Sequence, residues 1–271
     1  MGAFAATAAW AEGTADDSGS KGEAKRSSGA EVAADSGSSG DSSNSQNSSS
    51  SSSSHSKHPA YSDVIKDFKT IEGVIKLHKK DNRVYAELTS SQLNRDFIVL
   101  ISIAKGIGEG SLLAGMTWGF GDDWLWQFRK VDDNIQIVRR NVRFRAAHGS
   151  PEEHAVKLAY TDSVLFSLPI MTTSSSGGMV VDLTQVFMSD LPQISHMLPG
   201  FAFAANKSSW AAVKGFEKNV ELEVAATYAS SGRMELDTVP DSRGATINVH
   251  YSLSPLPQTG YHPRLADDRV G

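Results

Sequence analysis

The sequence contains no cysteine, and this absence excludes a disulfide-stabilised scaffold, a zinc site with thiolate ligands and a cysteine nucleophile. It also lacks any stretch near the roughly 18 consecutive apolar residues of a membrane-spanning helix. Positive charge is not in excess, because 26 Lys and Arg face 31 Asp and Glu, for a net charge of −5. This balance argues against a nucleic-acid partner, which requires a concentrated basic surface.

Aromatic residues are missing from the segment Ser18–Ser56, where Val32 is the single bulky apolar residue. The segment consists mostly of Ser, Gly, Asp, Ala and Asn, with an uninterrupted serine run at Ser48–Ser54. Such a composition buries too little apolar surface to offset the entropy of ordering, so we expect a disordered Ser-rich tail. The remaining residues, about two hundred, suffice for one well-buried domain.

The first residues combine a short apolar stretch, GAFAATAAWAEG, with the triplet Ala9-Trp10-Ala11. This triplet fits the A-x-A pattern before a signal-peptidase cleavage site, here between Ala11 and Glu12. The pattern favours a signal peptide that lacks its basic start, and hence an exported protein, periplasmic or extracellular. An alanine-rich disordered start is the other interpretation. We assign residues 1–59 to this signal remnant and linker.

Residues 60–95 are predicted to form a small unit of one helix and one β-hairpin. Val64, Ile65, Phe68 and Ile71 predict a short amphipathic helix that ends at Gly73. The following stretch, VIKLHKKDNRVYAEL, alternates apolar and polar residues on both sides of a turn at 79–82, as in a β-hairpin.

Residues 96–260 are predicted to form a β-rich domain. The apolar run 97–104 predicts a central strand, and the stretch DDWLWQFRKVDDNIQIVRRNVRFRA predicts a hairpin with its turn at 132–134. Its second strand is expected to extend to Ala146, with Val142 and Phe144 on one face and Arg143 and Arg145 on the other. A helix is expected after Ser150 as N-cap and Pro151 at N1. Further strands are predicted in VLFSLPIM, GMVVDL, WAAVKGF, NVELEVAATYAS and ATINVHYSLS, and a short helix in LTQVFMSDL.

These patterns together predict a β-rich α+β fold, with largely antiparallel sheets, a few short helices and the disordered Ser-rich tail before them. The last residues, 261–271, carry the sequence YHPRLADDRVG, which has a proline and closely spaced charges of both signs. We expect this segment to be a connector to a following domain.

Local motifs for catalysis or metal binding are not found in the sequence. The eight histidines include no H-E-x-x-H pair, and no G-x-S-x-G nucleophile elbow is present. The glycine-rich GIGEG has Ser111 where a dinucleotide-binding loop has its third glycine, so a flexible loop is favoured. No catalytic residue and no metal ligand is therefore assigned in this chain.

One aromatic cluster is a candidate for binding. Trp118, Trp124 and Trp126, with Phe120 and Phe128, all occupy even positions and share a face within each strand. Burial on the core side of a sheet is the favoured interpretation. The alternative is a platform on which Trp118, Trp124 and Trp126 stack against a ligand. The nearby strip of arginines at positions 139, 140, 143 and 145 is explained by paired or solvated charges more simply than by a polyanionic partner.

Several longer stretches, in order, resemble the N-terminal region of a family of large exported bacterial zinc-dependent metallopeptidases. They are IEGVIKLHKKDNRVYAEL, LNRDFIVLISIAKG, LLAGMTW, DSVLFSLPI, VVDLTQVFMSD, VKGFEKNVELEVAATY and VHYSLSPLPQTGYHPRLADDRVG. In that family β-rich domains of unknown function precede an H-E-x-x-H catalytic domain, where zinc activates water and the motif's Glu acts as general base. The resemblance implies that zinc belongs to that domain, which this chain does not contain.

The resemblance leads to the expectation that this chain is a non-catalytic accessory region, inactive alone, which packs against or supports a peptidase domain in cis or as a separate chain. The alternative is a free-standing exported binding module for a glycan or a surface protein, which would use the tryptophan-rich hairpin. A hydrolase whose site is assembled from distant residues is a third class, and no pattern in the sequence favours it.

Overall fold

The computed structural model of the chain describes residues 58–118, 124–230, 232, 234–257, 259 and 260, all within one compact unit, Ser53–Gly271. The predicted signal remnant and serine-rich segment up to residue 57, Phe120 and the predicted connector 261–271 lie outside the described residues. The described residues form two antiparallel β-sheets, connected by short helices and turns.

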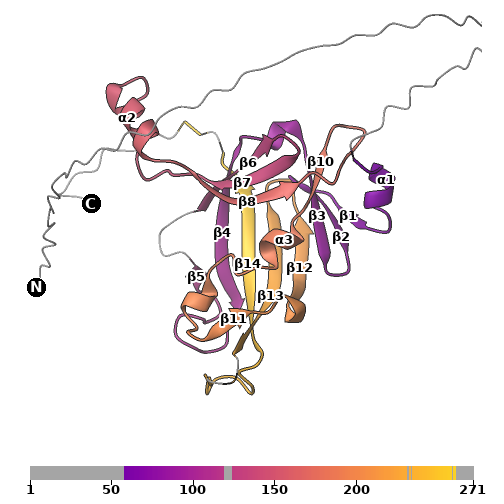
Figure 1. Cartoon of the computed structure of the whole chain (residues 1–271), viewed down its shortest axis with the longest axis vertical. Helices are drawn as coiled ribbons and strands as arrows, with labels where there is room; N and C mark the ends of the chain where they lie inside the picture. The colour runs from indigo at the N-terminus through magenta and orange to yellow at the C-terminus, as the bar shows by residue number, and fades with distance from the viewer. Residues whose placement is uncertain (1–57, 119–123, 231, 233, 258, 261–271) are drawn as a thin grey trace, which may run out of the picture. The chain divides into compact units, whose positions relative to one another are not determined.

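A five-stranded antiparallel sheet contains the first hairpin of the chain (Figure 1). Its strands, in spatial order, are β1 (Lys69–Ile71), β2 (Lys76–Lys80), β3 (Arg83–Leu88), β10 (Met179–Asp182) and β9 (Thr172–Thr173). Because β10 pairs with β3, this sheet crosses the boundary expected between residues 95 and 96.

A nine-stranded antiparallel sheet contains most of the remaining strands (Figure 1). Its main path runs through β11 (Phe201–Phe203), β13 (Val220–Ser230), β14 (Ala245–Pro255), β4 (Asp96–Lys105), β6 (Trp124–Val131), β7 (Asn134–Arg139) and β8 (Ser163–Pro169). Off this path, β12 (Ser209–Gly215) pairs with β13, and β5 (Thr117–Trp118) pairs with β4.

The helices are short. The α-helices are α1 (Tyr61–Val64), α2 (Pro151–Ala159) and α3 (Thr184–Phe187), and the 3₁₀ turns are η1 (Ser90–Gln92), η2 (Ile194–His196) and η3 (Ala205–Lys207). The predicted β-rich fold with antiparallel sheets and few short helices is therefore confirmed.

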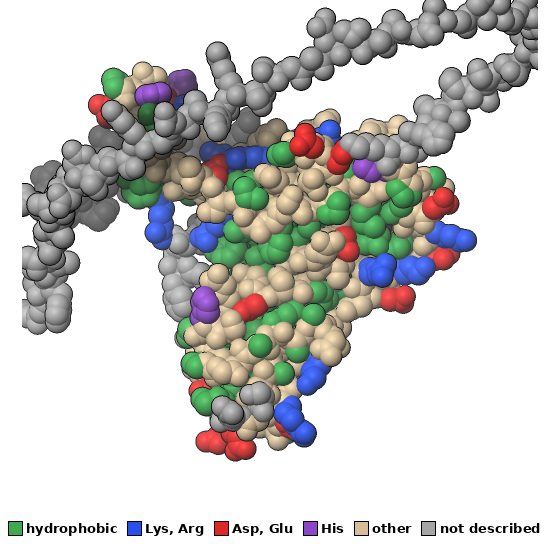
Figure 2. All heavy atoms as spheres, in the orientation of Figure 1, with side chains coloured by type: hydrophobic (Ala, Val, Ile, Leu, Met, Phe, Trp, Pro, Cys, Tyr) green, Lys and Arg blue, Asp and Glu red, His purple; other side chains and the backbone are tan. Residues whose placement is uncertain are grey.

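One hydrophobic core joins the two sheets. Alternate residues of β4, β13 and β14 point into it, and the antiparallel register places Leu222 opposite Tyr251 and Val224 opposite Val249. The ring of Phe187, from α3, lies within 4.9–6.3 Å of the rings of Tyr251, Trp210 and Trp126. Figure 2 shows hydrophobic side chains as a band across the visible face near α3, with Lys and Arg at the edge formed by the first hairpin.

The helix predicted for 61–73 is wrong beyond its first turn. Helix α1 ends at Val64, and the backbone of Asp67 then adopts a left-handed conformation, with φ of 64°, which does not allow the helix to resume. Residues 69–71 then pair with β2 as strand β1. The spacing of its apolar residues favours a helix, but pairing with the neighbouring strand β2 favours a strand. The tertiary contact overrides the local preference here.

The long second strand predicted for the tryptophan-rich hairpin is also wrong in part. The turn at Asp132 and Asp133 and the pairing of β6 with β7 are as expected, but β7 ends at Arg139. Residues 140–149 form no strand, although 142–146 alternate apolar and polar side chains. Strand β7 pairs with β6 on one edge and with β8 on the other, with a register shift between Ile137 and Val138, and both pairings end at Arg139.

Candidate interaction site

The segment 140–162, which we call the arm, leaves the nine-stranded sheet after β7 and returns to it at β8 (Figure 1). Its helix α2 begins as predicted, because Ser150 Oγ accepts a hydrogen bond from the amide of Glu153 at 3.2 Å and Pro151 occupies the first turn. Lys157 and the amide of Gly149, each 2.7 Å from the Glu153 carboxylate, lower the pKa of Glu153 to about 2. No residue of α2 is buried, so its internal capping bonds hold a helix that lies on the surface.

Two aromatic rings of the arm stack on each other at the surface. Phe144, before α2, and Tyr160, directly after it, have ring centroids 3.7 Å apart and planes inclined by 8°. Phe144 is 45% exposed and Tyr160 is 43% exposed, and Val164 at the start of β8 is 56% exposed. The arm and the adjacent strand therefore present an apolar surface to solvent.

This surface forms one wall of a groove of about 650 Å³ between the arm and strands β6–β8. Its apolar lining consists of Val138, Phe144, Ala146, Val156, Tyr160 and Val164. Charged side chains of both signs, including Arg145, Lys157 and Glu153, line it as well. A groove that combines exposed apolar side chains with charged groups has the chemistry of a surface that receives a segment of another protein.

The base of the arm is held to the sheet by a closed ring of polar side chains, which we call the anchor network. Arg129 Nη2 lies 2.5 Å from Asp162 Oδ2, and Arg140 joins Asp162 to Asp96 at distances of 3.4 and 3.1 Å. Gln127 completes the ring, because its Nε2 donates to Asp96 Oδ1 at 2.6 Å and its Oε1 accepts from Arg129 at 2.9 and 3.0 Å.

Asp162 is the central acceptor of the anchor network. Burial acts to raise the pKa of its carboxyl, but the amide of Asn141, at 2.9 Å, and the guanidinium groups of Arg129 and Arg140 outweigh burial and lower it. The carboxylate thus binds the first residues of the arm, Arg140 and Asn141, and Arg129 of strand β6 at once. This explains how the arm keeps a defined position without a hydrophobic core of its own.

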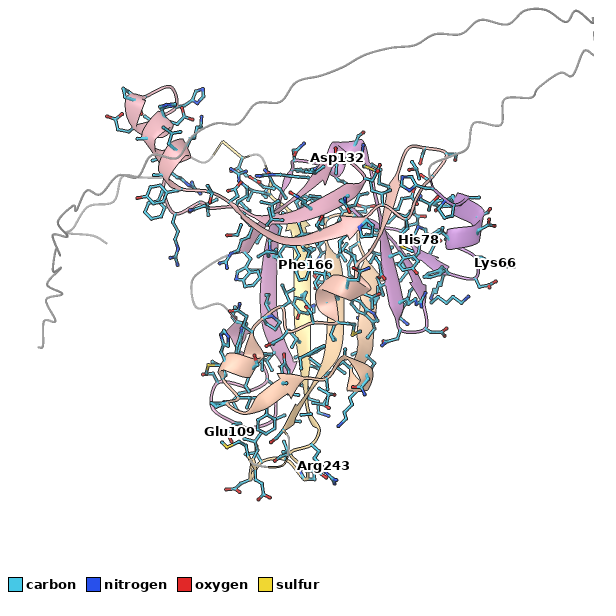
Figure 3. All side chains as sticks on the ribbon, viewed as in Figure 1. Lys66, His78, Glu109, Asp132, Phe166 and Arg243 are labelled. Carbon is cyan, nitrogen blue, oxygen red and sulfur yellow. The ribbon has the colours of Figure 1, made fainter. Side chains whose placement is uncertain are left out.

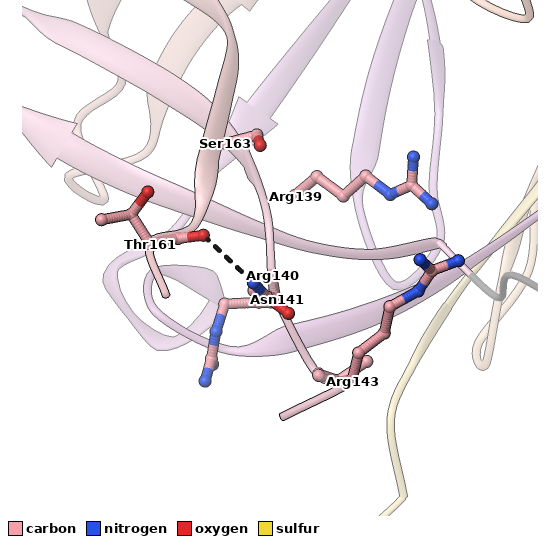
Figure 4. A pocket seen from close by; sticks show the side chains of 7 residues that line it. Arg139, Arg140, Asn141, Arg143, Thr161 and Ser163 are labelled. Atoms are coloured by element: carbon pink, nitrogen blue, oxygen red, sulfur yellow. Dashed lines mark hydrogen bonds between the residues drawn. The ribbon is translucent and has the colours of Figure 1, made fainter. Parts of the chain in front are cut away.

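A second, smaller pocket of about 240 Å³ lies at the same base (Figure 4), and we call it the arginine pocket. It is lined by Arg139, Arg140, Asn141, Val142, Arg143, Thr161 and Ser163. The arginine strip, which the sequence favoured as paired or solvated charge, is therefore divided between the anchor network, the groove and this pocket.

The structure does not bring the three candidate tryptophans together as an exposed platform. Trp126 is fully buried, with an exposed fraction of 0%, so it belongs to the core and cannot stack against a ligand. Trp124 is half-buried and has the guanidinium of Arg139 over its ring at 4.3 Å. Trp118 is half-buried, and its indole N–H donates to the carbonyl of Pro192 at 2.7 Å. The proposed stacking surface is corrected accordingly, and Trp126 is removed from it.

A buried polar cluster lies in the five-stranded sheet, around His78 (Figure 3). Glu87 accepts hydrogen bonds from Tyr61 at 2.9 Å and lies 3.2 Å from the His78 ring, whose other nitrogen lies 3.1 Å from Thr70. Burial and the hydrogen bond to Glu87 raise the pKa of Tyr61 to about 12. These contacts connect α1, β1, β2 and β3, and every one of these polar groups has a partner within the fold.

Histidines elsewhere in the described residues are not gathered into a ligand set. His250 lies 2.5 Å from Glu221 and His148 lies 3.4 Å from Glu153, each in a separate pair. Across the part of the chain that the structure describes, no group of three or more His, Asp or Glu side chains is placed to hold a metal ion. No helix among the described residues is both long and apolar enough to cross a membrane.

The fold and the groove define an antiparallel β-rich domain with a surface helix on an arm. The chain belongs to the family described as domain of unknown function DUF5117, whose model matches residues 121–271 and so includes the arm. Residues 58–106 match a second domain of unknown function, DUF5118. Comparisons with curated proteins and with solved structures found no match.

Proposed function

We propose that this chain is a non-catalytic accessory region that docks onto a partner protein domain through the groove beside the arm. The observation that carries the proposal is the stacked pair Phe144 and Tyr160, two large aromatic side chains that are nearly half exposed at the wall of that groove. Aromatic side chains at protein interfaces supply a large share of the binding free energy when they become buried.

The class of partner is inferred from the resemblance to the N-terminal region of exported zinc-dependent metallopeptidases. We propose that the partner is an H-E-x-x-H peptidase domain, in cis or as a separate chain, and that zinc and the catalytic residues belong to it. Under this proposal the chain is exported with its partner. Its own contribution is to bind, orient or stabilise the peptidase domain.

The anchor network supports this role because it fixes the arm relative to the sheet. A docking surface that is already ordered loses less conformational entropy on binding than a mobile segment does. Asp162 and Arg140 hold the two ends of the arm to strands whose other faces form the core, so the groove keeps its shape in the free protein.

A binding measurement tests the proposal directly. The purified chain is titrated against the separately produced zinc peptidase domain of a member of the resembling family, by isothermal titration calorimetry. We expect saturable binding, which Phe144→Ser weakens by about tenfold or more, as for an interface aromatic whose loss costs over ~1.4 kcal/mol.

Phe216→Ser is the matched control, because Phe216 is 49% exposed but lies outside the arm, after β12. We expect this variant to bind as the unaltered chain does. The proposal fails if the unaltered chain shows no binding, or if the two serine variants lose affinity equally.

A further inference from the structure

We propose that the groove beside the arm receives a partner segment that carries an acidic side chain next to a large apolar one, and that Arg145 recognises the carboxylate. This inference rests on the proposed docking function and adds the chemistry of the segment that is recognised. It stands on the charges that line the groove, on the geometry of the Arg145 guanidinium and on its position beside the aromatic stack.

Positive charge is in excess along the groove. Its charged lining among the described residues consists of Arg129, Arg140, Arg145, Glu153, Lys157 and Asp162. The two aspartates of the anchor network balance Arg129 and Arg140. Lys157 Nζ lies 2.7 Å from the carboxylate of Glu153 and forms a second balanced pair. Within the described lining, Arg145 therefore supplies the excess positive charge.

The guanidinium of Arg145 is oriented on one edge and faces solvent. Its Nε donates a hydrogen bond to the carbonyl of Val142 at 3.0 Å, which restricts the rotation of the group. The side chain is exposed, and it forms no ion pair with the carboxylates that the structure describes. A guanidinium has five N–H donors, and the four on its terminal nitrogens suit two parallel hydrogen bonds to a carboxylate.

The charged and the apolar parts of the groove lie side by side, because Arg145 directly follows Phe144 in the chain. Phe144 stacks on Tyr160 with ring centroids 3.7 Å apart, and both rings are nearly half exposed. All three residues line the same groove. A segment that covers the stack with a large apolar side chain therefore places its neighbouring residues within reach of Arg145.

Binding at the stack makes the charge of Arg145 selective. A segment that covers the two rings excludes water, and a charge interaction is stronger where water is excluded. A carboxylate opposite Arg145 then gains charge-assisted hydrogen bonds, whereas a neutral or basic residue leaves the guanidinium partly desolvated without a partner. Arg145 thus favours acidic segments and disfavours the others.

Charge variants of Arg145 test the inference, in calorimetric titrations with the zinc peptidase domain. Arg145→Gln should weaken binding by about tenfold, and Arg145→Glu by about thirtyfold or more, because it adds repulsion to the loss of the pair. Arg83→Glu is the matched control, since Arg83 is exposed at the start of β3, in the five-stranded sheet, and does not line the groove. Circular dichroism checks that each variant is folded.

A cross-linking experiment identifies the carboxylate of the partner. Arg145→Lys keeps the positive charge but loses the planar fork, so it should retain part of the affinity. It also introduces a primary amine, which a carbodiimide joins to a contacting carboxylate as an amide, with loss of water. We expect mass spectrometry to find a link from position 145 to an Asp or Glu that lies beside a large apolar residue of the peptidase domain. Arg83→Lys should give no link from position 83.

The outcomes separate this inference from the docking function. If Phe144→Ser weakens binding but Arg145→Glu does not, or if Arg145→Glu and Arg83→Glu weaken it equally, the recognition of a carboxylate is overturned and docking stands. If the peptidase domain does not bind at all, both are overturned. Sedimentation velocity of the chain alone is the last check. A dimer that Phe144→Ser abolishes would place a second copy in the groove and overturn the inference.

Discussion

Phe144 and Tyr160 stack face to face with their ring centroids 3.7 Å apart, and they lie on the two opposite sides of α2 in the chain. The stack therefore closes the arm into a loop, with the helix as its far end. Because neither ring is buried in the core, this contact joins the two ends of the arm to each other rather than to the sheet. The position of α2 depends on this stack and on the anchor network together.

We predict that Phe144→Ala loosens the arm without unfolding the domain. An aromatic pair contributes about 0.5–1.5 kcal/mol beyond the area it buries, so amide hydrogen exchange in α2 should accelerate by about two- to tenfold. Exchange in β13 and β14 should stay as it is. Leu158→Ala is the control, because Leu158 is 73% exposed on α2 and does not line the groove. Equal acceleration in both variants would mean that the stack does not hold the arm.

Local signals in the sequence were sufficient for the helix of the arm but not for its surroundings. Ser150, Pro151 and Glu153 lie within four residues of one another, so the beginning of α2 was predictable from capping alone. The alternation at 142–146 was equally regular, yet it gave no strand, because an alternating pattern does not indicate whether a partner edge is available. Strand β8, which pairs with β7, is the last strand on this path of the sheet. None of the described strands pairs with residues 142–146.

We predict that Asp162→Asn destabilises the domain by ~1–2 kcal/mol, measured as the free energy of urea unfolding. The carboxylate accepts from Arg129 and from the amide of Asn141 at a partly buried position, and the neutral amide cannot replace both charge-assisted contacts. Asp241→Asn is a strict comparison, since Asp241 and Arg243 form a pair with the same 2.5 Å separation.

The two ion pairs differ in how far their side chains are exposed to solvent. Arg243 is 77% exposed and Asp241 is 49% exposed, against 34% and 24% for Arg129 and Asp162. Exposed ion pairs contribute little because solvent screens them and their ordering costs entropy. We therefore expect no measurable change for Asp241→Asn. Similar losses in both variants would show that burial at the anchor network does not matter.

We predict that the stability of the domain falls in acid partly through Glu87. Burial acts to raise the pKa of this carboxyl, but hydrogen bonds from Ser174, Tyr61 and His78 outweigh burial and lower it below its ordinary value of 4.5. As the pH falls below about 4.5, the unfolded chain takes up the proton first, so the contribution of Glu87 is lost as the pH passes through its folded-state pKa. Above that window the contribution is complete.

Urea unfolding at several pH values between about 3 and 6 measures this effect, because the slope of stability against pH gives the difference in bound protons. Glu87→Gln should be less stable than the unaltered chain near neutral pH by ~1–3 kcal/mol, the cost of weakening a buried charged acceptor. Its stability should also depend less steeply on pH. Glu217→Gln, at an exposed position, should keep the steeper dependence of the unaltered chain. If the stability of all three proteins changed equally with pH, Glu87 would not contribute to the loss of stability in acid.

The candidate site was not predictable in full, because its parts are far apart in the sequence. The anchor network joins Asp96, Gln127 and Asp162, which lie on three different elements and carry no motif that links them. Trp126 was predictable as a core residue because it alternates with Trp124 and Phe128 along one strand, but the exposure of Phe144 and Tyr160 depends on where the chain leaves the sheet. Hydrophobic pattern indicates which segments can form strands, and tertiary contacts determine which of them pair and which side chains remain at the surface.

We predict that Gly215→Ala destabilises the junction between the two sheets by about 1–3 kcal/mol, the usual cost of overpacking. A Cβ at Gly215 would lie 2.5 Å from the carbonyl oxygen of Glu72, next to the point where the amide of Val74 donates to the carbonyl of Phe216 at 2.7 Å. The backbone cannot move there without breaking that hydrogen bond. Gly244→Ala is the control, since its Cβ would meet only Thr227 Cγ2 at 4.0 Å, and alanine lowers the entropy of the unfolded chain. Urea unfolding should therefore show a loss for the first variant and an equal or slightly higher stability for the second, and a neutral Gly215→Ala would contradict the close approach of the two backbones.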